Sequence, residues 1–131
     1  SLHRYGGFEH IEQQSRKPFW KPEFGQRVVM KPDIVINRNH ENCVVLDTKW
    51  KIIEGSNPSP EDLRQMYVYG HYFNASTITL VYPGSEFIYT KGSYFDGMGN
   101  TSEQECRVAV IPVNSNVKEW QREIARFINK F

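Results

Sequence analysis

Residues 30–51, MKPDIVINRNHENCVVLDTKWK, constrain the fold most, because they read as two apolar strands joined by a polar turn. The second strand, residues 43–53, is rich in the Val and Ile that favour extended backbone. The first strand, residues 33–36, follows Pro32, which cannot donate a hydrogen bond to a sheet and predicts a kink or bulge. We therefore expect an antiparallel hairpin around a turn at residues 37–42.

The hairpin register decides whether two aspartates meet. If Ile36 lies opposite Val44, then Asp33 lies opposite Asp47, and Lys49 points the same way as Asp47 because strand side chains alternate between faces. Facing residues have Cβ atoms roughly 4.5–5.5 Å apart, and like charges so placed are destabilising. A divalent cation offsets that repulsion, and Mg²⁺ binds carboxylate oxygens while keeping waters that a substrate phosphate can replace.

Lys49 has a chemical use beside such a metal. A cation there lowers the pKa of a metal-bound water and stabilises charge on a pentacovalent phosphate, so the pattern indicates phosphodiester hydrolysis. The same residues also fit an ordinary strand end. Asp33 after Pro32 can be turn chemistry, and Asp47 with Lys49 can be an ion pair of little energetic value.

The remaining pattern alternates between strands and helices. A helix is expected to begin after Ser59, a capping residue, with Pro60 in its first position, and to run to about residues 71–73. Further expected elements are strands at residues 26–30, 77–82, 87–89 and 107–112, a turn at 96–100, and an amphipathic helix at 117–131. This order predicts an α/β fold with a mixed sheet flanked by helices. We expect one domain over residues 1–131, with a poorly defined lead-in at 1–25 and a core at 26–131.

Composition narrows the classes of function. The 131 residues carry a net charge of only +1, so a nucleic-acid contact requires local basic patches. The two cysteines, Cys43 and Cys106, have no metal-ligand spacing and are expected to be buried free thiols of a reducing compartment. No apolar run is long enough to span a membrane, which predicts a cytoplasmic protein. The chain opens at Ser1 without a methionine, so we expect a fragment of a longer protein.

Two groups of basic residues are candidates for such a patch. The first is a stripe on the last predicted helix, which fits either DNA contact or a solvated face, and the second lies upstream of the hairpin and is better placed. The aromatic residues, Trp50 included, are expected to be core. The stripe comprises Lys118, Arg122, Arg126 and Lys130, and the upstream group comprises Lys17, Lys21, Arg27 and Lys31.

The order of these motifs resembles a known enzyme family. Pro32-Asp33, then Asp47-Thr48-Lys49, then a helix with Gln65 and Tyr69 is similar to the PD-(D/E)XK nucleases that carry a QxxxY motif. The segments KPDIVI, VVLDTKWK and DLRQMYVYGHYF, within residues 27–73, look like the nuclease domain of McrC, from the McrBC restriction system directed against 5-methylcytosine.

The resemblance implies a restriction-endonuclease-like fold and a Mg²⁺-dependent DNA endonuclease, with Mn²⁺ as a substitute. It implies Asp33 and Asp47 as metal ligands, completed by the Thr48 carbonyl, with Lys49 as the catalytic lysine. Gln65 and Tyr69, one helical turn apart, would orient the site and contact substrate. The candidates for DNA contact are Lys31, Lys51 and Tyr69.

The resemblance also implies binding partners, and it leaves alternative functions open. Methylated DNA and a GTP-driven AAA+ partner like McrB are implied, whereas this chain has no P-loop of its own. Many relatives place a glutamate on a helix before the first strand, and only Glu9, Glu12 and Glu23 are available here. The alternatives are an inactive nuclease fold kept for binding or assembly, and a repair or transposition nuclease.

Overall fold

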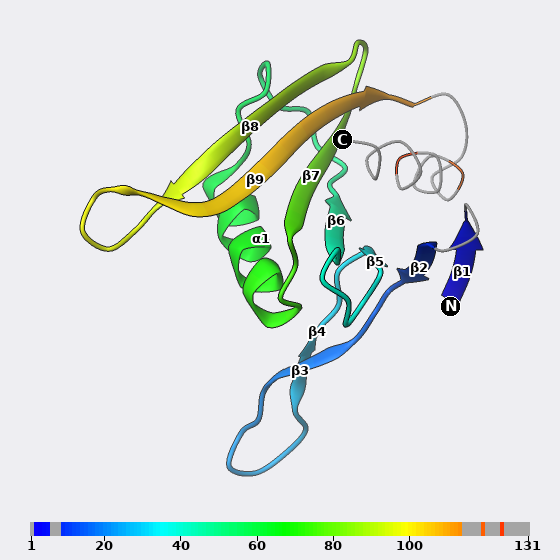
Figure 1. The fold of residues 1–131 in the computed structure, drawn as a ribbon, viewed down its shortest axis with the longest axis vertical. Helices are drawn as coiled ribbons and strands as arrows, with labels where there is room; N and C mark the ends of the chain where they lie inside the picture. The colour runs from blue at the N-terminus through cyan, green and yellow to red at the C-terminus, as the bar shows by residue number, and fades with distance from the viewer. Residues whose placement is uncertain (1, 6–8, 114–118, 120–123, 125–131) are drawn as a thin grey trace.

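The computed structural model describes residues 2–5, 9–113, 119 and 124 (Figure 1). These residues form nine strands and one helix, α1, which spans Pro60–Tyr72 between the sixth and seventh strands. The strands are β1 (Leu2–Tyr5), β2 (Glu9–Gln13), β3 (Lys17–Trp20), β4 (Val28–Met30), β5 (Ile34–Ile36), β6 (Val44–Thr48), β7 (Thr77–Gly84), β8 (Ile88–Phe95) and β9 (Thr101–Pro112).

Seven of these strands form one mixed sheet in the order β1-β2-β5-β6-β7-β9-β8. The central strands β6, β7 and β9 run parallel, and the outer pairs are antiparallel. The other two strands, β3 and β4, pair with each other and project away from the sheet as an arm (Figure 1). The predicted mixed α/β sheet is therefore confirmed, with α1 packed against one of its faces.

The N-terminal region is more ordered than the sequence suggested. The lead-in at residues 1–25 contains β2 and β3: β2 pairs with β5 through Ile11 opposite Ile36, and β3 pairs with β4. The β2 segment, EHIEQ, contains one apolar residue, so it lacks the alternation of apolar and polar residues that predicts a strand. Its strand conformation comes from pairing with β5, which lies well over twenty residues later in the chain.

Helix α1 begins where local chemistry predicts. Ser59 has extended backbone angles, and its side chain accepts a hydrogen bond from the Asp62 N–H at the first turn. Pro60 takes the first helical position, where its missing N–H is not needed. The helix ends at Tyr72, as expected, and within the described residues no helix is long and apolar enough to cross a membrane.

The strand boundaries differ from the prediction at several points. The strand expected at residues 43–53 ends at Thr48, and those expected at 87–89 and 107–112 extend to 88–95 and 101–112. The turn expected at residues 96–100 is present, with Asp96 accepting backbone hydrogen bonds across it. The predicted helix at 117–131 lies outside the described residues apart from Glu119 and Ile124, and so does its basic stripe.

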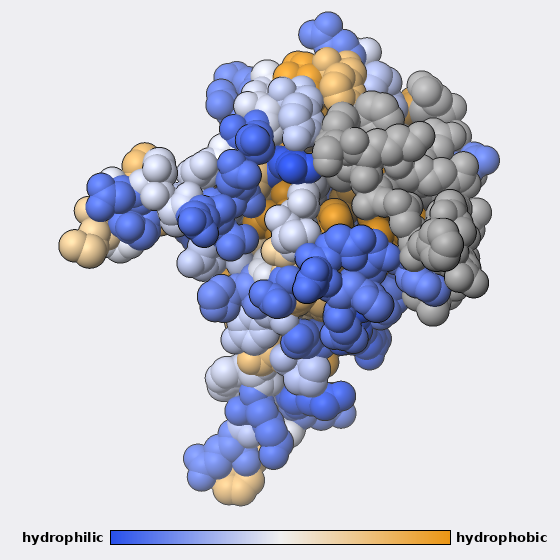
Figure 2. All heavy atoms as spheres, viewed as in Figure 1, coloured by the Kyte–Doolittle hydropathy of each residue, from blue (hydrophilic) through white to orange (hydrophobic). Residues whose placement is uncertain are grey.

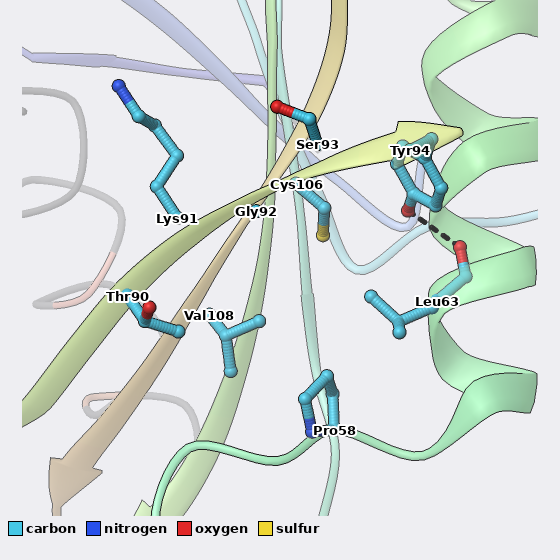
Figure 3. Close-up of a pocket in the computed structure, with 9 residues that line it drawn as sticks. All are labelled: Pro58, Leu63, Thr90, Lys91, Gly92, Ser93, Tyr94, Cys106 and Val108. Carbon is cyan, nitrogen blue, oxygen red and sulfur yellow. Dashed lines mark hydrogen bonds between the residues drawn. The ribbon is translucent and has the colours of Figure 1, made fainter. Parts of the chain in front are cut away.

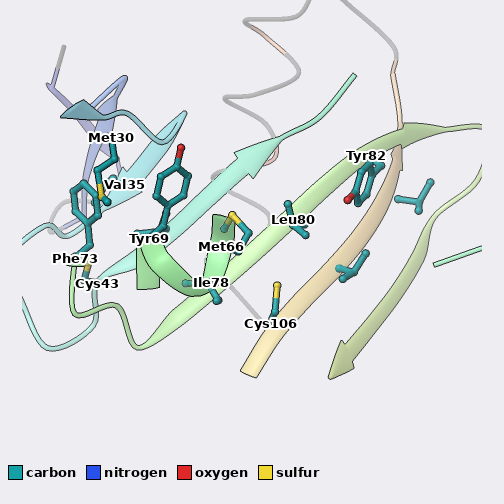
Figure 4. Packing of buried hydrophobic residues seen from close by; sticks show 13 residues of the cluster. Met30, Val35, Cys43, Met66, Tyr69, Phe73, Ile78, Leu80, Tyr82 and Cys106 are labelled. Carbon is teal, nitrogen blue, oxygen red and sulfur yellow. The ribbon is translucent and has the colours of Figure 1, made fainter. Parts of the chain in front are cut away.

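The core occupies both faces of the sheet. One cluster packs α1 against the sheet and includes Val35, Met66, Tyr69 and Leu80 (Figure 4). A second cluster on the opposite face includes fully buried Leu46 and the helical residue Ile124. Each such aliphatic side chain stabilises the fold by about 1.5–3 kcal/mol when fully buried. The expected aromatic core is partly wrong, since the Trp50 side chain is 54% exposed just beyond the end of β6.

Candidate active site

The β5–β6 hairpin brings the two predicted aspartates together. Ile36 pairs with Val44 and Ile34 with Leu46, which is the register assumed in the sequence analysis. Continuing this register by one residue places Asp33 beside Asp47. Both lie at the end of β6 that is also the carboxyl end of the parallel strands β6 and β7, where open α/β sheets commonly bind ligands.

Hydrogen bonds hold the two carboxylates in a fixed relation. Oδ1 of Asp47 accepts a hydrogen bond from the Asp33 N–H at 2.9 Å. Oδ2 of Asp33 accepts from the Thr48 N–H at 2.9 Å and from the Thr48 hydroxyl at 2.7 Å. A carboxylate offers about four lone-pair sites, so both groups keep acceptor capacity for a cation. Backbone N–H groups of Asp33 and Thr48 therefore help to fix the positions of the two carboxylates.

The electrostatics of Asp47 are those of a buried acid beside a second acid. The Asp47 residue is only 4% exposed. Its burial and the neighbouring Asp33 carboxylate raise its pKa to about 6, although the Lys49 ammonium opposes that shift. Negative charge here is therefore costly in the free protein, and a cation that binds both carboxylates relieves that cost.

Lys49 links the acidic pair to helix α1. Its Nζ lies 2.9 Å from Oδ2 of Asp47 and 2.5 Å from Oε1 of Gln65, to which it donates. The Gln65 side chain in turn donates through Nε2 to the Tyr69 hydroxyl at 2.9 Å. Burial and the charges of Asp47 and Asp33 raise the pKa of Tyr69 to about 12, so the hydroxyl keeps a proton to donate. All five predicted catalytic side chains thus lie in one chain of contacts.

The oxygen atoms available at this site suit a hard cation, but few side chains supply them. Carboxylate and carbonyl oxygens are the ligands that Mg²⁺ and Mn²⁺ prefer, and Asp33, Asp47 and the adjacent Thr48 supply them. Within the part of the chain that the structure describes, no three His, Cys, Asp or Glu side chains gather to hold a metal. The candidate Glu12 instead pairs with Arg38 at 3.1 Å, and Glu23 lies exposed in the arm.

Gln14 is a site residue that sequence reasoning missed. It follows β2 with a φ of 55°, its backbone N–H donates to the Asp33 carbonyl, and its side-chain Nε2 donates to Asp33 Oδ1 at 3.2 Å. The Gln14 side-chain amide therefore contacts Asp33 from the residue just after β2, the strand that pairs with β5. No local pattern marks this residue, because its role depends on the pairing of β2 with β5.

The three predicted DNA-contact residues occupy different surroundings. Lys31 and Tyr69 line one groove between the arm and α1, and its volume is about 410 Å³. Lys51 instead forms an ion pair with Asp62 at 2.9 Å, and Oδ2 of Asp62 also accepts from the Tyr82 hydroxyl at 2.7 Å. The structure therefore ties Lys51 to the start of α1, while Lys31 lines the same groove as Gln65 and Tyr69 of the candidate site.

A separate apolar cavity of about 220 Å³ lies between α1 and strands β8 and β9 (Figure 3). Leu63, Tyr94 and Cys106 line it, and the Tyr94 hydroxyl donates to the Leu63 carbonyl at 2.7 Å. Burial raises the pKa of the Cys106 thiol to about 11, so this thiol is not a reactive nucleophile. Cys43 and Cys106 are both free and buried, as predicted.

Two comparisons with known proteins identify what this chain is similar to. The family model described as "McrBC 5-methylcytosine restriction system component" matches residues 3–83, which include every predicted site residue. A solved complex of Thermococcus gammatolerans McrB AAA+ hexamers with bound McrC contains a chain similar in fold, with a TM-score of 0.57 and 19% sequence identity. That similarity covers 91% of this chain and 28% of the other.

The search of curated proteins finds no match. The family match extends over more than half of the residues and contains both aspartates, the lysine and the Gln65–Tyr69 helix. The similarity in fold is consistent with the restriction-endonuclease-like fold predicted for this chain, in which a mixed sheet packs against a helix. This chain belongs to the family of McrBC 5-methylcytosine restriction system components.

Proposed function

We propose that this chain is the DNA-cleaving domain of a McrBC-like, modification-dependent restriction system and works as a Mg²⁺-dependent endonuclease. The observation that carries the proposal is the pairing of Asp33 with Asp47 by the hairpin, with Lys49 bridging Asp47 to Gln65 on α1. Two carboxylates held this close repel each other, and that repulsion must be offset, which a bound cation does.

Each residue has a role that follows from its contacts. Asp33 and Asp47 would hold the cation, with the Thr48 carbonyl beside them, and the bound ion would supply an activated water and charge neutralisation at the phosphate. Lys49 would orient that water and would stabilise the negative charge that develops on the phosphate oxygens. Gln65 holds the Lys49 ammonium in place, and the protonated Tyr69 hydroxyl donates to the substrate backbone.

The partners follow from the family and from the structural neighbour. The neighbour's complex contains McrB AAA+ hexamers with bound McrC, so we propose that a McrB-like GTPase delivers methylated DNA to this domain. The family match favours restriction over repair or transposition. Two buried free thiols support a cytoplasmic setting, where such thiols stay reduced.

A second candidate is an inactive nuclease fold that serves assembly. The observation in its favour is that the described residues bring no third acidic side chain to Asp33 and Asp47. This rival predicts that the acidic pair binds no divalent cation, whereas the endonuclease proposal predicts that it does. Metal affinity therefore separates the two candidates before any cleavage assay.

The experiment is calorimetric titration of Mn²⁺ into the wild-type chain, Asp47→Ala and Asp62→Asn. We expect binding by the wild type, loss in Asp47→Ala, and retention in Asp62→Asn, which changes a second buried aspartate that also pairs with a lysine. Circular dichroism checks that each variant is folded. Equal, negligible binding by wild type and Asp47→Ala would reject the enzyme and support the assembly module.

A further inference from the structure

The β3–β4 arm, defined as residues 16–31, concentrates positive charge that the rest of the chain lacks. It contains five Lys or Arg residues and one Glu, whereas the remaining residues carry eleven basic and fourteen acidic side chains. A nearly neutral molecule thus presents one strongly basic projection. Basic projections of this kind attract the phosphates of nucleic acids.

The base of the arm is anchored to α1. The Phe19 ring packs edge-on against Tyr72 with ring centroids 5.3 Å apart, and Lys17 Nζ lies 5.4 Å from the centre of the Phe73 ring. Met30, the last residue of β4, is buried in the core cluster on the α1 face (Figure 4). The arm therefore leaves the body at a defined place rather than as an unattached loop.

The end of the arm carries aromatic rings that contribute little to the core. Trp20 is 59% exposed and Phe24 is 87% exposed, and Lys21 and Arg27 are exposed between and beside them. Figure 2 shows the arm as hydrophilic over most of its length, with hydrophobic atoms at its end. Interleaved basic and aromatic side chains are the combination that binds nucleic acid, with cations on phosphates and rings stacked on bases or sugars.

The arm also borders the candidate active site. The groove at its base is lined by Phe19, Val29 and Lys31 from the arm and by Gln65, Val68 and Tyr69 from α1. Gln65 contacts Lys49, which contacts Asp47. A DNA strand lying along the arm would therefore pass directly into the catalytic constellation.

We propose that the β3–β4 arm grips DNA beside the cleaved bond, with its lysines and arginines on phosphates and its exposed aromatic rings on bases. The inference rests on the proposed nuclease function and adds a substrate-binding element to that site. It assigns sequence-independent affinity to the arm, because phosphate contact and stacking read no particular sequence. Selection of methylated DNA sites would then depend on residues outside the arm.

The test is fluorescence anisotropy of a labelled DNA duplex with the full chain in EDTA, so that no cleavage takes place. Lys21→Ala/Arg27→Ala is compared with wild type and with Lys91→Ala, which removes an exposed charge on β8. We expect the arm variant to bind the duplex about tenfold more weakly than wild type. The magnitude of its slope of log K against log salt concentration should fall by about 1 for each lost phosphate contact. Lys91→Ala should match wild type in both affinity and slope.

A second variant separates stacking from charge. Trp20→Ala/Phe24→Ala should weaken binding about fivefold or more while leaving the salt slope unchanged. Because these side chains are exposed, the thermal midpoint of both arm variants should equal that of wild type. Arm variants that bind DNA like wild type, or a wild-type chain that binds no DNA in EDTA, would overturn the proposal.

The same assay keeps the two proposals apart. Asp47→Ala should lose Mn²⁺ binding yet still bind the duplex in EDTA, because the arm rather than the acidic pair supplies the DNA affinity. If the arm variants bind Mn²⁺ normally and bind DNA with unchanged affinity, the proposal that the arm binds DNA is rejected, and the proposed nuclease function still stands. Arm variants that bind DNA normally but fail to assemble with a AAA+ partner would assign the arm to that partner, against the proposal.

Discussion

At the scale of single residues, the main feature is the free-energy cost of keeping two carboxylates as close neighbours. Asp47 is buried against Asp33, and its pKa is raised to about 6 despite the ion pair with Lys49. Such a site lowers the free energy of unfolding of the metal-free protein, and binding of a cation restores it. Binding sites commonly show this trade between stability and function.

We expect Asp47→Asn to stabilise the protein in EDTA by about 2 kcal/mol at pH 8. A carboxyl whose pKa is raised in the folded state stabilises fully below its ordinary pKa, and that stability is lost as the pH rises from about 4 through about 6. The gain from the variant should therefore vanish near pH 4. Urea denaturation of both proteins at the two pH values measures it. Lower stability of the variant at pH 8 would show that the Lys49 ion pair outweighs the repulsion.

Tyr69 is expected to act on catalysis rather than on folding. Tyr69→Phe removes the hydroxyl that accepts from Gln65, so Gln65 and Lys49 lose part of their orientation. DNA cleavage with Mg²⁺ and the GTPase partner should fall about 10- to 100-fold, with Mn²⁺ affinity unchanged. Tyr67→Phe, on the same helix and more exposed, is the matched control. Equal cleavage by the two variants would contradict the role.

At the scale of elements, α1 is tied to the sheet at its first turn. Asp62 accepts from the Tyr82 hydroxyl of β7 and pairs with Lys51 just beyond β6. Burial alone would raise the pKa of Asp62, but the hydrogen bonds from Lys51 and Tyr82 and the Lys51 and Lys49 charges lower it below its ordinary value. The same contacts hold the start of the helix that carries Gln65 and Tyr69.

Asp62→Asn should destabilise the protein by about 1 kcal/mol at neutral pH. A depressed folded pKa contributes stability above the ordinary carboxyl pKa, and this contribution is lost as the pH falls through the folded value. The difference between variant and wild type should therefore disappear in strong acid. Thermal melts between neutral pH and the acid limit test the sign, and a difference that grows toward low pH would contradict it.

The parallel pairing of β7 with β9 requires a small residue at its end. A Cβ on Gly84 would stand 2.3 Å from Val110 Cγ1, whereas one on Gly92 would meet nothing within 4 Å. Gly84→Ala should therefore destabilise by about 1–3 kcal/mol through overpacking, and Gly92→Ala should cost much less. Chemical denaturation of both variants compares them. Equal effects would show that Val110 moves aside freely.

At the scale of the whole molecule, metal binding and folding stability are coupled. A ligand that binds only the folded state stabilises it by about 2.7 kcal/mol when present at 100 times its Kd. Mn²⁺ should accordingly raise the thermal midpoint of the wild-type chain and leave that of Asp47→Ala unchanged. A shift of equal size in both proteins would place the cation somewhere other than the acidic pair.

The sequence by itself determined the hairpin and the helix start, and it left the hairpin register as an assumption that the structure then supported. Alternating side chains and a short turn allow few pairings, so one assumed register sufficed to place Asp33 beside Asp47, only fourteen positions along the chain. The Ser59 cap likewise acts on its own helix. These features depend on local chemistry, which a sequence displays directly.

Only the tertiary structure decided the surroundings of that site. The β2 strand, the Gln14 contact to Asp33, and the pairing of Lys51 with Asp62 all require distant segments to meet, and their own residues are polar and carry no periodic signal. The arm was visible in the sequence only as scattered basic and aromatic residues. Pairing of β3 with β4 and packing against α1 gather them beside the site, because contacts between distant segments form only when the whole core assembles.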